Sequence, residues 1–128
     1  MNKIDFPELS QLADASAAVT AICTCSAVPL LAWQKLPLSL DLDDLEEIGT
    51  LVDDPYGEPT FTEYHPQGTR YESEDAPIAP RYFPCNRSQV LHCRACRRHF
   101  LQYNEAGGYF TELRIRALRP ELLIDAPL

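Results

Sequence analysis

Four cysteines arranged as two close pairs constrain the fold of this chain more than any other feature of its sequence. One pair is a Cys-x-Cys, and the other is a Cys-x-x-Cys that follows after 67 intervening residues. Structural zinc takes four nitrogen or sulfur ligands at tetrahedral positions, and two pairs on tight turns can supply them. We therefore expect one structural zinc ion that ties the two halves of the chain together. Its expected ligands are Cys23, Cys25, Cys93 and Cys96.

Residues near the second pair offer other ligand sets. Cys85, His92 and His99 all lie close to it in sequence, so a mixed set could replace the Cys-x-Cys pair. Buried thiols without any metal are a third reading, because cysteine is among the most buried residue types. Four thiolates leave no open position for water, so we expect the metal to be structural rather than catalytic.

The ends and length of the chain set its expected location and organisation. Residues 1–7 lack the apolar core of a secretory signal, and no apolar run approaches the roughly 18 residues that span a bilayer. We therefore expect a soluble cytoplasmic protein, in which thiols stay reduced and bind metals before they form disulfides. A length of 128 residues fits one domain, residues 1–128.

The net charge of −8 is unevenly spread, with −12 over residues 1–80 and +4 over residues 81–128. An acidic surface attracts a basic protein and speeds their encounter, although it also serves solubility alone. We expect a basic protein partner, such as a bacterial toxin, rather than nucleic acid or a membrane. The expected partner-binding residues are Asp41, Asp43, Asp44, Glu46, Glu47, Asp53, Asp54 and, as an aromatic anchor, Tyr56.

The chain pattern predicts two helices before the sheet. Asp5 and Glu8 resemble a capping box, which predicts a helix over about residues 6–17. Apolar residues at helical spacing, acids in the first turn and a glycine stop predict a short acidic helix over residues 41–48. We expect residues 60–72 to form a hairpin around Gly68, and residues 73–87 to run extended over the surface.

The last third of the chain is expected to be β-rich. Alternating side chains predict strands near residues 89–92, 99–104 and 109–117, with the Cys-x-x-Cys turn between the first two. Together these elements predict an α+β fold, in which the two helices pack on an antiparallel sheet that carries a zinc-ribbon-like knuckle.

Two other functions remain open from the sequence. A zinc-ribbon regulator or adaptor would contact nucleic acid through basic side chains, namely Arg94, Arg97, Arg98, Arg114 and Arg116. An enzyme would use Cys85 as nucleophile, with a histidine base and a carboxylate to orient it. The candidate bases are His65 and His92, and the candidate carboxylates are Glu63 and Glu105. We expect a non-catalytic binding module.

Two stretches and the second cysteine pair carry a resemblance. Residues 58–66 (EPTFTEYHP) and 104–110 (NEAGGYF), with Cys93-x-x-Cys96 between them, resemble a family of uncharacterised small bacterial proteins over residues 23–127. The resemblance implies no catalytic residue. Size, acidity and a single domain are also similar to those of immunity proteins, which bacteria make against their own secreted toxins.

Overall fold

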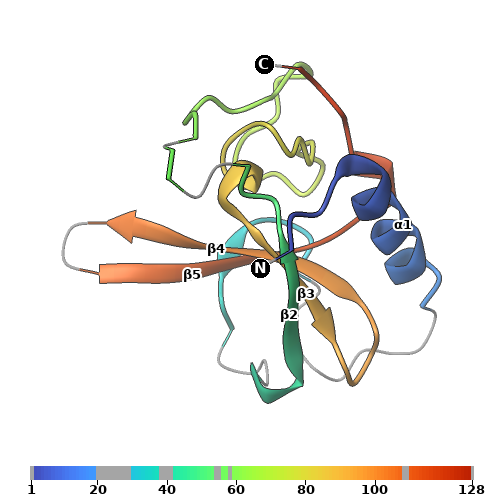
Figure 1. The fold of residues 1–128 in the computed structure, drawn as a ribbon. Helices are drawn as coiled ribbons and strands as arrows, with labels where there is room; N and C mark the ends of the chain where they lie inside the picture. The colour runs from blue at the N-terminus through green and yellow to red at the C-terminus, as the bar shows by residue number, and fades with distance from the viewer. Residues whose placement is uncertain are drawn as a thin grey trace.

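The computed structural model describes residues 2–19, 30–37, 42–53, 56–57, 59–107 and 110–127. These residues form a helix beside a five-stranded antiparallel sheet (Figure 1), so the expected α+β class is confirmed. Among these residues, the structure contains no helix with the length and apolar character that crossing a membrane requires.

Helix α1 spans Phe6–Ala17 and begins where the sequence predicts. Asp5 is its N-cap, and the Asp5 carboxylate accepts a hydrogen bond of 2.9 Å from the backbone N–H of Glu8. Leu9 and Ala13 lie on one face of the helix and are fully buried. At the far end of α1, the backbone N–H of His99 donates to the Ser16 hydroxyl over 2.9 Å, which fixes the helix against the sheet.

The sheet has the strand order β1-β5-β4-β3-β2, and all neighbouring strands are antiparallel. The strands are β1 (Gln34–Lys35), β2 (Leu45–Thr50), β3 (Gln89–Cys93), β4 (His99–Gly107) and β5 (Phe110–Ala117). The three strands expected in the last third of the chain are therefore confirmed. β4 and β5 form the hairpin that projects furthest from α1 (Figure 1).

The predicted acidic helix over residues 41–48 is wrong. Leu42–Asp44 form a single 3₁₀ turn, and the chain then enters edge strand β2. Residues three apart on a strand lie on opposite faces, so Leu45 packs on one face of the sheet and Ile48 on the other. Both faces are covered by apolar side chains, so both positions are apolar and their spacing matches that of a helix. A β-bulge between Glu47 and Gly49 interrupts the strand at this point.

The segment between β2 and β3 also differs from the prediction. Gly68 does turn the chain with a positive φ of 79°, but residues 59–77, all of them described, contain no paired strands. Residues 73–87 do not run over the surface, because Ala76, Ile78 and Cys85 are buried in the core. Ile78 pairs with Leu123, next to the 3₁₀ turn Pro120–Leu122.

Both faces of the sheet are covered by apolar side chains. On one face, α1 and the loops enclose a first cluster formed by Ile4, Leu9, Ala13, Trp33, Leu51, Ile78, Cys85, Val90, Leu101, Tyr103 and Leu118. On the other face, a second cluster is formed by Leu30, Leu91, Cys93, Phe100 and Ile115. The sheet therefore separates Cys85, in the first cluster, from Cys93 and Cys96 at the second cluster.

Candidate binding surface and cysteine sites

The Cys-x-x-Cys pair lies where β3 turns into β4. The backbone N–H of Arg97 donates to the Cys93 carbonyl over 2.7 Å, and the N–H of Cys93 donates to the Arg98 carbonyl over 2.9 Å. Arg97 adopts a positive φ of 65°, which closes the turn. Cys93 is fully buried and Cys96 half-buried, and both belong to the second cluster. A tight turn of this kind brings two thiols close enough to share a metal.

The other half of the expected zinc site, Cys23 and Cys25, lies outside the described residues. Within the residues that the structure does describe, no three His, Cys, Asp or Glu side chains are arranged to hold a metal ion. The four-cysteine zinc site and the zinc-ribbon-like knuckle therefore stay predictions.

The alternative ligands do not lie on the same side of the sheet as Cys93. Side chains alternate between the faces of a strand, so His92 points away from the face that holds Cys93. His99 pairs directly with His92 and shares its face. Cys85 belongs to the first cluster and Cys96 to the second. A mixed set that joins Cys85, His92 or His99 to the cysteine pair would have to cross the sheet, so this geometry argues against it.

The acidic residues gather along the edge of the sheet. Asp43 and Asp44 lie in the 3₁₀ turn, Glu46 and Glu47 are exposed on edge strand β2, and Asp53 follows the end of that strand. Two further candidates, Asp41 and Asp54, lie outside the described residues. We call Asp43, Asp44, Glu46 and Glu47 the acidic edge.

The acidic edge is held to the cysteine turn by Arg94. Its backbone N–H donates to the Asp44 carbonyl over 2.7 Å, and its guanidinium donates to the Asp43 carbonyl over 3.0 Å. These bonds use backbone oxygens rather than the carboxylates. The turn that carries Cys93 and Cys96 therefore positions the start of the acidic edge.

A groove of about 460 Å³ lies beyond the other end of β2. Its apolar walls include Ile4, Leu51 and Val52, and its charged rim includes Lys3 and Asp53, whose side chains form an ion pair of 3.4 Å. Gly57 also lines the groove, and its neighbour Tyr56 is 98% exposed. This volume is within the range of small-ligand pockets. The groove therefore places an apolar surface at the end of β2 that lies away from the 3₁₀ turn.

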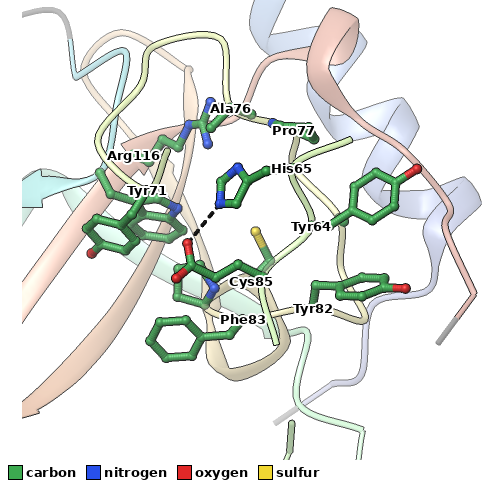
Figure 2. Close-up of a pocket in the computed structure, with 13 residues that line it drawn as sticks. Tyr64, His65, Tyr71, Ala76, Pro77, Tyr82, Phe83, Cys85 and Arg116 are labelled. Atoms are coloured by element: carbon green, nitrogen blue, oxygen red, sulfur yellow. Dashed lines mark hydrogen bonds and ion pairs between the residues drawn. The ribbon is translucent and has the colours of Figure 1, made fainter. Parts of the chain in front are cut away.

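Three residues of the possible Cys/His enzyme line one small cavity, namely Cys85, His65 and Glu63, whereas His92 and Glu105 do not line it. Figure 2 shows His65, Cys85 and Arg116 around it. Glu63 also lines the cavity and is hydrogen-bonded to His65. Both ring nitrogens of His65 are already engaged, Nε2 with Glu63 over 2.8 Å and Nδ1 with Thr69 over 2.7 Å. The cavity measures about 10 Å³, which is space for about one water molecule.

Burial also keeps Cys85 in its thiol form. Removal of the side chain from solvent raises the Cys85 pKa to about 11, and the nearby Arg116 cation only partly offsets that rise. The nucleophile of a cysteine enzyme is the thiolate. Neither the thiol nor the engaged histidine is arranged for nucleophilic catalysis.

The proposed nucleic-acid residues do not form one basic surface. Arg116 is fully buried and donates to the carbonyls of Ala76 and Glu74, over 2.6 and 3.2 Å. Arg114 is paired with Glu112 over 2.6 Å, and Arg94 reaches Asp43 as described above. Phosphate binding needs several exposed cations together. This arrangement disfavours the nucleic-acid adaptor.

Sequence reasoning missed two features of the first face. Tyr71 and Tyr103 are hydrogen-bonded through their hydroxyls, and Tyr103 donates to Glu105 over 2.7 Å. His92 and His99 form a cross-strand pair. His92 and His99 lie at equal distances in sequence from the midpoint between Ala95 and Cys96, so an antiparallel turn centred there would have revealed the pair.

No protein-family model, curated protein or solved structure matches the chain. The resemblance to small bacterial proteins and to immunity proteins therefore stays a prediction, and function has to be argued from the geometry.

Proposed function

We propose that this protein is a non-catalytic, zinc-stabilised protein-binding module whose acidic edge captures a basic partner, in the manner of an immunity or antitoxin-like protein. The observation that carries the proposal is the place of Glu46 and Glu47 on edge strand β2, exposed and next to the 3₁₀ turn with Asp43. Edge strands bind partner strands through their backbone, and side chains select the partner.

The charges on β2 disfavour pairing of this strand with β2 of another copy of the chain. Two glutamates would repel the same glutamates on a second β2, and the bulge at Glu47–Gly49 interrupts regular pairing. A strand rich in lysine or arginine would instead meet opposite charges. The N-terminal segment already bonds to Thr50, so the available part of the edge is its first half, near Leu45–Glu47.

The groove supports the same kind of partner. A long basic side chain could lay its aliphatic stem on Leu51 and Val52, with its charged head near Asp53. We place this function in the cytoplasm, where reduced thiols remain available to the metal. Zinc at the cysteine pairs would hold the turn to which Arg94 fastens the acidic edge.

The test uses a synthetic peptide of alternating lysine and valine as probe. We expect it to bind the protein with an affinity that falls as salt rises from about 50 to 200 mM, because salt screens exposed charges. The triple variant Asp43→Lys, Asp44→Lys and Glu47→Lys should lose affinity by about tenfold or more.

A charge-matched control separates a local site from net charge. Glu72, Glu74 and Asp75 are exposed on the loop after Gly68, far from β2 in the chain. Reversal of these three to lysine changes the net charge equally and should leave most of the affinity. Equal losses in the two triple variants would refute the acidic edge as the binding site. The immunity role is tested by whether co-expression protects cells from a basic toxin encoded beside this gene.

A further inference from the structure

Two histidines face each other across the central strands of the sheet. His92 on β3 pairs with His99 on β4, and their ring centroids lie 4.9 Å apart with a tilt of 40°. His99 is only 7% exposed, and its Nδ1 is buried with no hydrogen-bond partner among the described residues. A buried ring nitrogen without a partner needs an explanation, and a bound ion is one of the standard ones.

A carboxylate lies beside the two histidines on the same face of the sheet. Glu46 on β2 pairs directly with His92, so Glu46, His92 and His99 follow one another across three strands on one face. Glu46 is exposed and His92 half-buried, so the row runs from the solvent into the interior. Glu47 points to the opposite face, because neighbouring residues of a strand alternate.

The spacing of the rings suits a shared metal ion. Two imidazoles that bind one zinc at about 2.1 Å with a tetrahedral angle have their centroids roughly 5 Å apart. Imidazole ligands suit Zn²⁺, Cu²⁺ and Ni²⁺, and the neutral ring is the form that binds.

We propose that His92 and His99, together with Glu46, bind one divalent transition-metal ion on the sheet face opposite Cys93. The three side chains are not pre-arranged, since no group of three ligands is found in the described part of the chain. Binding therefore requires the exposed Glu46 side chain to turn toward the pair, and water completes the coordination. This site is separate from the expected cysteine site and does not depend on the proposed partner.

Cobalt(II) is the probe that distinguishes the two sites. Co²⁺ is titrated into the metal-free protein, in which a thiolate site would add an intense near-ultraviolet sulfur-to-cobalt band. We expect about one equivalent to bind with visible d–d bands and without that sulfur band. Nitrogen and oxygen ligands give that spectrum, whereas thiolates add charge transfer.

Variants assign the ligands. His92→Gln keeps the size of a half-buried side chain and should weaken cobalt binding on the order of 100-fold, since even outer-shell changes cost 10- to 100-fold. Glu46→Gln should weaken it by about tenfold, and the matched variant Glu47→Gln should leave cobalt affinity unchanged. Circular dichroism of each variant checks folding. Absence of a cobalt site with the spectrum of nitrogen and oxygen ligands, or unchanged affinity in folded His92→Gln, would overturn the site.

Discussion

At the scale of single residues, Arg116 shows that a charged side chain on an alternating strand is not always exposed, because this sheet is covered on both faces. β5 places Ile115 and Arg116 on opposite faces, and both are fully buried. Arg116 lies on the face of the first cluster, and its guanidinium donates to the carbonyls of Glu74 and Ala76. A cation on this strand is therefore an internal clamp on the loop rather than a contact for an external anion.

We expect Arg116→Ala to destabilise the protein by about 2–5 kcal/mol, because it removes charged hydrogen bonds and leaves a cavity. Arg114 is the matched control on the same strand and face, since its ion pair with Glu112 is partly exposed. Arg114→Ala should cost at most about 1 kcal/mol. Urea unfolding of both variants measures the two costs, and equal costs would mean that Arg116 does not clamp the loop.

Cys85 carries a second prediction at this scale. Its burial and its pKa of about 11 predict very slow alkylation by iodoacetamide at pH 8 in the folded protein, because the reactive thiolate is almost absent. In urea the same thiol should react at the rate of an ordinary cysteine. Peptide mass spectrometry follows Cys85 alone. Fast selective labelling of Cys85 in the folded state would restore the enzyme hypothesis.

At the scale of elements, edge strand β2 depends on a close approach by the N-terminal segment. Thr50 donates to the Asn2 carbonyl over 2.8 Å, and Ile4 donates to the Thr50 carbonyl over 2.9 Å. Gly49 makes this approach possible. A Cβ at Gly49 would lie 2.5 Å from Cγ1 of Ile4 and 2.9 Å from the Asn2 carbonyl oxygen.

We expect Gly49→Ala to destabilise the protein by about 1–3 kcal/mol, as overpacking usually does. Most of the strain comes from the Ile4 side chain, so in the Ile4→Ala background the same substitution should cost less. A double-mutant cycle by urea unfolding measures this coupling, with an expected magnitude of about 1 kcal/mol. Additive costs would show that the clash is with backbone alone.

A helix or strand of this fold could be predicted where a pattern within its own stretch of sequence determines it. Asp5 and the following helical pattern gave α1, and strict alternation gave β5. β2 was not predictable in this way, because Leu45 and Ile48 pack on opposite faces of a sheet covered on both sides, and their spacing equals that of a helix. The His92 and His99 pair and the burial of Arg116 depend on register and on what covers each face, which no single stretch of sequence contains.

At the scale of the whole molecule, the sheet divides two candidate metal sites. The cysteine turn lies on the face of the second cluster, and the histidine pair lies on the face of the first. Lower pH makes the net charge of −8 less negative, so the effect of a single histidine has to be isolated by comparison with a variant.

The histidine pair predicts how stability depends on pH. His99 has its pKa lowered from 6.5 to about 4, so between these values the unfolded chain binds a proton that the folded protein does not. The free energy of unfolding should therefore fall as pH drops from about 6.5 to 4, by about 3 kcal/mol in total from this residue. Above pH 6.5 both states are neutral at His99, and its contribution is constant.

Two measurements in metal-free protein check this dependence. Urea unfolding at several pH values should show a steeper loss for the wild type than for His99→Gln, whose side chain does not titrate. Where that variant is too unstable to compare, NMR of the wild-type ring should show His99 still neutral at pH 5. Burial is the larger cause of the lowered His99 pKa and the electrostatic effect of His92 the smaller one, so His92→Gln should raise the His99 pKa in part. An ordinary titration of His99 near pH 6.5 in the folded protein would contradict the lowered pKa of this buried ring.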